Sequence, residues 1–354
     1  MISFTNDYSE GAHPRILEKL VAFNLEQNRG YGEDVHCNKA KEYIKQQINR
    51  EDVDIHFIPG GTQTNLLVIS SFLRPHQCVI AADTGHINVH ETGAIEATGH
   101  KVVTLPSPDG KVTPQMIHKV LESHEGEHMV QPKMVYISDT TELGTIYSKK
   151  ELEEIREVCL ENGLLLFLDG ARLASALTCK ANDLSLEDIA RLVDVFYIGG
   201  TKNGALLGEA LVICKEELKE DFRFMIKQRG AMLAKGFVLG IQFETLFWPE
   251  DCLYYDLAKH ANHMAEQIAD EITACGFEFY VPVVSNQLFP VLPNSLLNEL
   301  EKRFLFSRQA KVGEDKTAIR FVTSWATTQE QVKELLEFFQ KFTALTAEGG
   351  NYVN

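Results

Sequence analysis

Short apolar runs alternate with amphipathic segments through much of the chain. Apolar runs typical of buried strands occupy 77–83, 101–105, 133–138, 164–168 and 194–198. The segments between them have the hydrophobic periodicity of helices, at 66–72, 90–98, 116–122 and 150–161. Because strands without polar interruption need cover on both faces, this order predicts an α/β fold with a mostly parallel sheet and helices on both sides of it.

The pattern changes after residue 198. The apolar run at 210–214 follows the strand at 194–198 after only a short Gly-rich loop, which predicts an antiparallel neighbour. One long helical tract is predicted over 215–247, and Trp-Pro-Glu-Asp then breaks the pattern. Beyond it, predicted helices at 257–274, 295–303 and 328–342 mix with strands at 277–281, 287–292 and 318–323. We therefore predict an N-terminal segment and large domain over 1–249, and a small α+β domain over 250–354.

Composition excludes several classes of partner. The 354 residues carry a net charge of −16 with no block of like charges, which disfavours binding to nucleic acid or to an anionic membrane. The first residues lack the basic flank and apolar run of a signal peptide, and no stretch has the length of a membrane span. We expect a cytoplasmic protein whose seven scattered cysteines are reduced and bind no zinc.

Two strand ends carry the residues that say most about function. The run Leu-Leu-Leu-Phe-Leu ends in Asp169, and the next apolar strand ends in Gly-Gly-Thr followed by Lys202. Ligands bind at the carboxyl ends of strands in an open α/β sheet. A carboxylate can keep a pyridine nitrogen protonated, and a desolvated lysine can form a Schiff base. The pair predicts a pyridoxal phosphate enzyme, although Asp169 alone could equally be a helix cap.

A glycine-rich turn supplies a candidate anion site. Gly60, Gly61 and Thr62 lie between a strand and a helix, where free backbone amides and the helix dipole favour a phosphate. The turn has neither the Lys-Ser/Thr of a Walker loop nor the Gly-x-Gly-x-x-Gly spacing of a dinucleotide site. Taken alone, such a turn is more often a simple cap, so its interpretation depends on the neighbouring strand ends.

Further candidates are one histidine and two arginines. His86 follows a third strand end, where it could stack on a cofactor ring or act as an acid and base. We do not expect a metal site there, because no second ligand cluster accompanies it. Arg172 lies three residues after Asp169, and Arg320 is a lone cation in an apolar strand. Arg320 could pair with a structural carboxylate or with the α-carboxylate of an amino acid.

These residues resemble, in kind and order, those of the threonine aldolase and β-eliminating lyase family of fold-type-I pyridoxal phosphate enzymes. The matching landmarks are Asn6-Asp7, Tyr31-Gly32-Glu33-Asp34, Pro59-Gly60-Gly61-Thr62, the His86 segment, Leu168-Asp169-Gly170-Ala171-Arg172, Thr201-Lys202 and Ile319-Arg320-Phe321-Val322-Thr323. The resemblance covers nearly the whole chain. It implies an aspartate aminotransferase-like fold with a seven-stranded sheet, and a homotetramer or homodimer with shared active sites.

The resemblance also implies roles around the cofactor, pyridoxal 5'-phosphate. Lys202 would carry it as a Schiff base, and Asp169 would pair with its ring nitrogen. Gly61 and Thr62 would bind its phosphate. His86 would stack on the ring and, directly or through a water, take the proton from the substrate.

For the substrate, the resemblance implies an amino acid whose carboxylate binds Arg172 and Arg320, together with Asn6. Arg172 and Thr201 would also lie beside the cofactor. Tyr31 would line an active site, that of a neighbouring subunit being one alternative. These roles predict cleavage of a β-hydroxy-α-amino acid, with L-threonine or L-allo-threonine giving glycine and acetaldehyde.

The chain departs from the family pattern at substrate-handling positions. Thr141 stands where the family has a histidine that helps at the substrate β-hydroxyl, and Asn6 stands where the family has serine. Either Arg229 or Lys235 could meet the phosphate. A related β-eliminating lyase or an aminotransferase is therefore the second hypothesis. A non-catalytic binding protein on the same type of fold is the third, with Lys202 structural.

Overall fold

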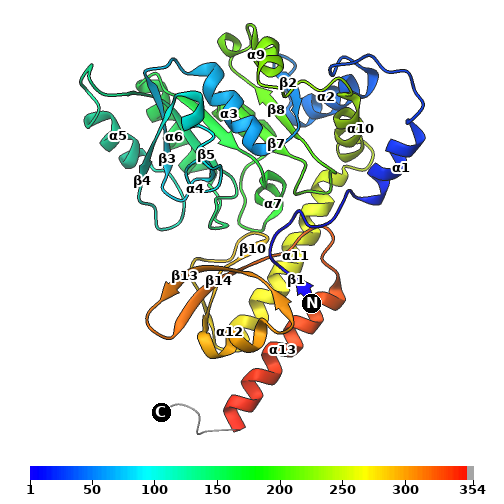
Figure 1. Cartoon of the computed structure of the whole chain (residues 1–354), viewed down its shortest axis with the longest axis vertical. Coiled ribbons are helices and arrows are strands. Elements are labelled where there is room, and N and C mark those ends of the chain that lie inside the picture. Colours follow the sequence, from blue (N-terminus) through cyan, green and yellow to red (C-terminus); the bar gives the residue numbers. More distant parts are fainter. Residues whose placement is uncertain (349–354) are drawn as a thin grey trace.

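The computed structural model describes residues 1–348 and contains a large sheet and a smaller one, joined by the long helix α11 (Leu253–Ala274) (Figure 1). The large sheet has the strand order β2 (Asp54–Ile58), β8 (Glu209–Ile213), β7 (Val195–Gly199), β6 (Leu165–Asp169), β5 (Gln131–Ser138), β3 (Gln77–Ala82), β4 (Lys101–Leu105). Only β8 runs against its neighbours. The mostly parallel seven-stranded sheet is therefore confirmed, and so is the antiparallel strand after Lys202.

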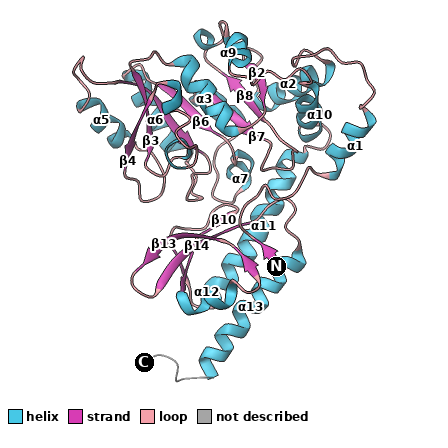
Figure 2. Ribbon diagram, viewed as in Figure 1, coloured by secondary structure: helices cyan, strands magenta, loops and turns pink. Residues whose placement is uncertain are grey.

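Helices enclose the large sheet on both faces (Figure 2). They are α2 (Val35–Ile48), α3 (Gly61–Phe72), α5 (Pro114–Glu122), α6 (Lys149–Glu161), α8 (Leu186–Leu192), α9 (Phe222–Gln228) and α10 (Phe237–Leu246). Alternate residues of β5 enter different cores. Val135 and Ile137 pack on the side of α6 and α8, whereas Met134 and Tyr136 pack on the side of α3 and α9. Burial of both faces explains why the strands read as uninterrupted apolar runs.

Two predicted helices are wrong in extent. The helix expected over 90–98 is instead the single turn α4 (His86–Val89) and, later, the 3-10 turn η1 (Glu96–Thr98). Thr92 and Gly93 between them have φ of 52° and 72°, and two left-handed residues in succession cannot continue an α-helix.

The tract expected as one helix over 215–247 is divided into the 3-10 turn η2 (Glu216–Leu218), α9 and α10. Gly230, with φ of 74°, lies just beyond α9 and takes the left-handed conformation common after helix ends. The loop that follows leads to α10 at Phe237.

The smaller sheet is antiparallel around β14 (Lys316–Val322). Its other strands are β10 (Gln287–Leu288), β11 (Pro290–Pro293), β9 (Glu278–Phe279) and β13 (Ser307–Val312), and its helices are α12 (Asn294–Leu300) and α13 (Gln329–Glu348). The chain begins beside this sheet, because β1 (Ile2–Ser3) pairs with β12 (Phe304–Leu305) and Phe4 packs on Phe321. The N-terminal segment thus bridges to residues 250–354 before α1 (Pro14–Ala22) packs on α10.

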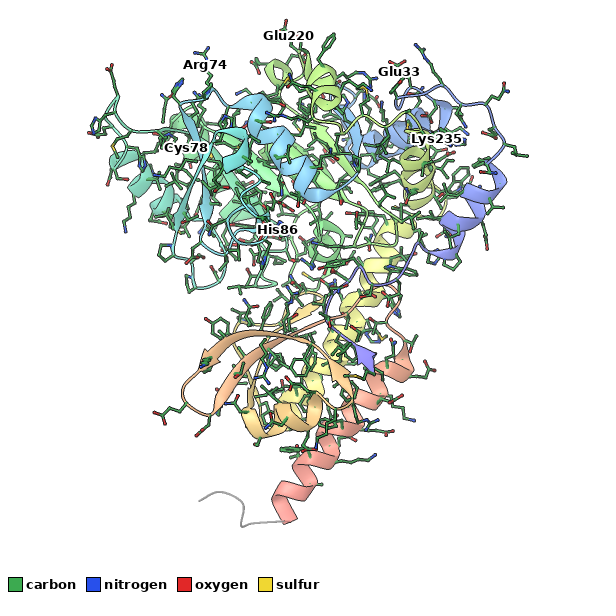
Figure 3. The ribbon with its side chains drawn as sticks, in the orientation of Figure 1. Glu33, Arg74, Cys78, His86, Glu220 and Lys235 are labelled. Carbon is green, nitrogen blue, oxygen red and sulfur yellow. The ribbon has the colours of Figure 1, made fainter. Side chains whose placement is uncertain are left out.

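The boundary predicted between residues 249 and 250 falls in the loop between α10 and α11, and the division into domains stays a prediction. Within residues 1–348, no helix combines the length and the apolar character that crossing a membrane requires. The parallel strands β3, β5, β6 and β7 all end at the same edge of the large sheet. In Figure 3, His86, which follows β3, lies at the edge that faces the smaller sheet.

Candidate active site

A cavity of about 410 Å³ opens at this edge of the large sheet. Seven of the sequence-predicted site residues line it: Gly61, Thr62, His86, Asp169, Arg172, Thr201 and Lys202. They lie at or just beyond the ends of β2, β3, β6 and β7. The strand ends that were singled out for their chemistry therefore meet in one place.

Asp169 is the most firmly held acid in the cavity. Its side chain is buried, with 4% exposed, and both carboxylate oxygens accept hydrogen bonds. Oδ1 accepts from the Ala171 backbone (3.0 Å) and the Tyr197 hydroxyl (2.5 Å), and Oδ2 accepts from the Tyr136 hydroxyl (2.6 Å) and the Asn65 amide (3.0 Å). Four donors from three elements fix the position of the carboxylate.

The same contacts keep Asp169 ionised. Burial alone would raise its pKa, but the charge of His86 and the hydroxyls of Tyr136 and Tyr197 outweigh burial, and the pKa is lowered. Sequence reasoning missed both tyrosines, since each lies in an apolar strand and reads as core. The only sequence feature that could have indicated them is the hydroxyl group that each carries on the strand face toward α3.

Lys202 lies in the cavity with its amine available. Within residues 1–348 it makes no hydrogen bond or ion pair that would occupy it. Burial lowers its pKa, and the nearby Arg172 lowers it further, against the opposing pull of Asp7 and Asp169. A desolvated lysine beside another cation has the neutral fraction that a nucleophilic amine needs.

Thr201 and a carboxylate that sequence reasoning missed brace the loop of Lys202. Glu209, buried at the start of β8, accepts hydrogen bonds from the Gly200 backbone (2.9 Å) and the Thr201 hydroxyl (2.8 Å). Burial raises the pKa of Glu209 to about 7. The hairpin formed by β7 and β8 therefore holds the lysine in place.

The N-terminus of α3 offers an uncapped anion site. Gly60 stands at the N-cap without a side-chain hydrogen bond, and the space where its Cβ would lie is open. Gly61 and Thr62 follow and line the cavity. Their backbone amides belong to the first turn, which has no acceptors within the helix. An anion such as a phosphate suits this position.

His86 is fixed by a second buried acid. Its Nδ1 lies 2.9 Å from Oε1 of Glu91, which also accepts from the Asn65 amide at 2.8 Å. Burial alone would lower the pKa of His86, but the hydrogen bond to Glu91 and the charge of Asp169 outweigh it and raise the pKa. His86 and Asp169 are thus joined through Asn65, a relation that no local sequence pattern indicates.

The two predicted arginines differ in their partners. Arg172 donates to both oxygens of Asp7, from Nε at 2.7 Å and from Nη2 at 3.0 Å. Arg320 is half-buried, donates weakly from Nη2 to the Thr5 carbonyl at 3.4 Å, and leaves its buried Nε without a partner in residues 1–348. Burial and the charge of Arg172 lower the pKa of Arg320. An incoming carboxylate would therefore relieve an uncompensated cation.

Replacing Asp7 with asparagine is expected to lower the free energy of unfolding by about 3 kcal/mol, since removing one partner strands a buried charge. Asp7 is 1% exposed, and Arg172 lowers its pKa against the opposing effect of burial. The stabilisation from Asp7 is therefore present above its ordinary pKa and is lost as pH falls through the lowered value. Urea unfolding at several pH values measures both effects.

The matched control for Asp7→Asn is Glu10→Gln, which removes an exposed carboxylate from the same segment. That change is expected to stay within about 0.5 kcal/mol. Equal unfolding midpoints for Asp7→Asn and the wild type would contradict the assigned role of the ion pair.

Two predicted substrate residues lie elsewhere in this chain. The side chain of Asn6 accepts from the Tyr8 backbone (2.9 Å) and the Ser9 hydroxyl (3.0 Å), which builds a local turn. Its neighbour Asp7 is the residue that meets Arg172. Tyr31 lines a separate cavity with Arg223, so its contribution to an active site could come only through a neighbouring subunit and stays a prediction.

The remaining sequence alternatives are not among the residues that line the cavity. Lys235 is exposed near α10 and far from His86 (Figure 3). Arg229 is half-buried, and its carbonyl accepts from Gln63 of α3 at 3.2 Å. Thr141 is fully buried and bonds the Thr145 hydroxyl at 2.7 Å, which turns it away from the cavity. Thr141 therefore cannot take the place of the family histidine at the substrate β-hydroxyl.

Other residues line the cavity without having been predicted. They are Tyr8, His90, Ser138, Thr140, Glu142 and Glu209, with Pro59, Ala171, Tyr197 and Leu207, whereas Gly60 belongs to the predicted anion site. Ser138 ends β5, and the strand-end rule that found Asp169 could have found it too. Among residues 1–348, no group of three or more histidine, cysteine, aspartate or glutamate side chains is arranged to hold a metal ion.

Comparison with known proteins places these features in a family. The model of the β-eliminating lyase family matches residues 7–295. The low specificity L-threonine aldolase of Pseudomonas sp. (strain NCIMB 10558) is 32% identical over 339 residues, covering 94% of this chain and 95% of that protein. The chain belongs to the threonine aldolase and β-eliminating lyase family. This is a family of lyases, as the sequence landmarks predict.

Solved structures agree with this family assignment. A threonine aldolase from Leishmania major superposes with a TM-score of 0.95 at 51% identity, covering 97% of this chain and all of that one. An aspartate aminotransferase from Thermus thermophilus superposes with a TM-score of 0.71 at 14% identity, covering 96% of this chain and 91% of that one. The second likeness confirms the aspartate aminotransferase-like fold alone.

Proposed function

We propose that this member of the family is a pyridoxal phosphate-dependent aldolase that cleaves L-threonine and L-allo-threonine to glycine and acetaldehyde. The observation that carries the proposal is the meeting of Lys202 and Asp169 in one cavity, beside the uncapped N-terminus of α3. Relatives named low specificity L-threonine aldolase support the choice of substrate.

The chemistry of the cavity fits the cofactor. Asp169 is an ionised acceptor for a protonated ring nitrogen, Lys202 is an unpaired amine, and α3 offers amides to a phosphate. When bound, pyridoxal phosphate supplies an imine bond to the substrate amine and a ring that takes up the electron pair released at Cα. His86, braced by Glu91, would lie against that ring.

The protein's own groups would orient the substrate. Arg320 has an unpartnered buried Nε, and Arg172 keeps its guanidinium in place through Asp7, so the two can hold a carboxylate between them. Fixing the carboxylate limits rotation about the bond to the amine, which decides which bond at Cα is broken. The α-amino acid class of substrate follows from this cationic pair.

The deciding experiment mixes purified protein, pyridoxal phosphate and L-threonine and follows acetaldehyde through a coupled alcohol dehydrogenase. We expect equimolar glycine and acetaldehyde, with L-allo-threonine also accepted. Turnover of another amino acid without release of aldehyde would overturn the aldolase assignment and leave the cofactor assignment standing.

A β-eliminating lyase is the second candidate, favoured by the description of the matching family and by Thr141 facing away from the cavity. It predicts pyruvate and ammonia from serine or cysteine analogues. An aminotransferase would instead need a keto acid and would convert the cofactor to its pyridoxamine form. Assaying all three products on one protein preparation separates these reactions.

Replacing Arg320 with glutamine is expected to reduce kcat/KM for threonine roughly 10- to 100-fold, since a charge-assisted hydrogen bond contributes about 1.5 to 3 kcal/mol. The loss should appear in KM, because the cation binds the carboxylate, and also in kcat, because the bound carboxylate sets which bond at Cα is broken. Titration of the cofactor into the apo-protein should give the wild-type affinity. Unchanged KM would remove Arg320 from substrate recognition.

We also infer that the protein assembles as a homotetramer or homodimer with shared active sites and acts in the cytoplasm. Tyr31, Phe224 and Val21 are exposed large apolar side chains, which supports burial between subunits. Light scattering of the purified protein tests the assembly, and a monomer of 39.8 kDa would contradict it.

A further inference from the structure

We propose that Glu142 is the base that takes the proton from the β-hydroxyl of the substrate. This inference rests on the proposed aldolase function and names the group that completes it. Glu142 lies in the loop after β5 and lines the same cavity as Lys202 and His86. A half-buried carboxyl in a cavity of this kind is a candidate acid or base that the cofactor-binding residues do not use.

The contacts of Glu142 fix one oxygen and leave the other toward the cavity. Oε1 accepts from the His86 backbone amide and from the Ser138 hydroxyl, each at 2.8 Å. Within residues 1–348, Oε2 has no hydrogen-bond partner, and it is not sealed from the cavity. A base held by one oxygen and open at the other is positioned before the substrate arrives.

Burial and the surrounding charges raise the pKa of the Glu142 carboxyl. Burial raises the pKa of Glu142, and the ionised Asp169 raises it further, although Ser138 and His86 act in the opposite direction. The titratable groups around it are Tyr136, Tyr147, Asp169, Arg172 and His86. A carboxylate with a raised pKa is a stronger base than an ordinary surface glutamate.

The two histidines of the cavity are poorer candidates. His86 has its Nδ1 engaged by Glu91, and its ring is the group expected to lie against the cofactor. His90 is exposed at the rim, and its ring lies 5.6 Å from that of His86. Within residues 1–348, no hydrogen bond fixes the side chain of His90. Glu142 alone combines a free basic oxygen with a fixed position.

The β-hydroxyl proton passes to Oε2 of Glu142, and the O–H electron pair becomes the second bond of the aldehyde carbonyl. The Cα–Cβ bond breaks, and its electron pair stays at Cα, which a bound pyridoxal phosphate would stabilise as an electron acceptor. Cα is then protonated from water to give glycine, and Glu142 returns its proton to water, so that no net proton is gained or lost.

The test uses Glu142→Gln, which keeps an amide oxygen for Ser138 and the His86 amide but removes the base. We expect kcat for cleavage of threonine to fall about 10²- to 10⁴-fold, the usual contribution of a general base. Affinity of the apo-protein for pyridoxal phosphate, followed by tryptophan fluorescence, should not change. Exchange of the Cα hydrogens of glycine into deuterium oxide, followed by NMR, should also persist because glycine has no β-hydroxyl.

Further variants separate a chemical role from a structural one. Formate should restore part of the activity of Glu142→Gly by supplying a carboxylate in the vacated space. Thr141→Val, which alters the neighbouring side chain that faces away from the cavity, should keep most of its activity.

Two outcomes would overturn the assignment. One is wild-type kcat in Glu142→Gln, and the other is loss of cleavage in His90→Asn while Glu142→Gln stays active. Failure of the proposed function is distinct from either, since the wild type itself would then release no aldehyde.

Discussion

Replacing Lys202 with alanine is expected to abolish both covalent attachment of the cofactor and cleavage of threonine. Loss of a catalytic nucleophile costs on the order of 10⁴-fold or more in kcat, because no other group restores the covalent route. Within residues 1–348, no other lysine lines the cavity. The wild type should be yellow, should be bleached by borohydride, and should then carry a mass adduct on Lys202.

The control for this experiment is Lys180→Ala, which removes an exposed lysine paired only with Glu266. It should retain the colour, the adduct and the activity. An adduct that persists in Lys202→Ala, or a wild type that forms none, would contradict the assignment. A colourless wild type with normal folding would instead favour the non-catalytic binding protein that fold alone permits.

Much of the fold and the centre of the site could be predicted from local pattern. Asp169 and Lys202 each follow an uninterrupted apolar strand, and parallel strands deliver their carboxyl ends to one edge. That topological rule brings His86 and Thr62 to the same cavity, although they are distant in sequence. The antiparallel β8 followed from loop length alone.

What the sequence could not predict is set by contacts between distant segments. Asp7 contacts Arg172 because the pairing of β1 with β12 fixes the N-terminal segment beside the smaller sheet, and no local sequence motif predicts that pairing. Glu91 was expected within a helix, yet the left-handed turn at Thr92 ends the helical path and leaves its carboxylate beside His86. Tertiary geometry, in these cases, overrides local propensity.

The cavity holds both cationic and acidic side chains, and the sequence does not indicate which of them pair with one another. Arg172 pairs with Asp7, whereas the burial of Arg320 and the nearby charge of Arg172 lower the pKa of Arg320. Of the acids that line the cavity, Asp169 and Glu209 are buried and Glu142 is half-buried, and burial raises the pKa of Glu209 to about 7. A substrate carboxylate can therefore bind the two arginines, and a phosphate can bind the N-terminus of α3.

Replacing Asp169 with asparagine is expected to lower kcat on the order of 10³-fold, comparable to the loss of a preorganised electrostatic group. The change keeps the shape of the side chain but removes the charge that favours a protonated ring nitrogen. The amide oxygen can still accept from one of Tyr136 and Tyr197, and the other hydroxyl can turn to accept from the amide nitrogen, so folding should be retained. Steady-state kinetics with threonine and the absorbance of the bound cofactor, each as a function of pH, measure the effect.

A charged cofactor analogue distinguishes ring protonation from a merely structural role of Asp169. Asp169→Ala leaves space beside the ring nitrogen, and N-methylated pyridoxal phosphate carries a fixed positive charge there. The analogue should restore part of the activity of Asp169→Ala and should serve the wild type poorly, because its methyl group meets the carboxylate. If the analogue fails to rescue Asp169→Ala while the variant binds it and unfolds at the wild-type temperature, the carboxylate does not act through the charge of the ring.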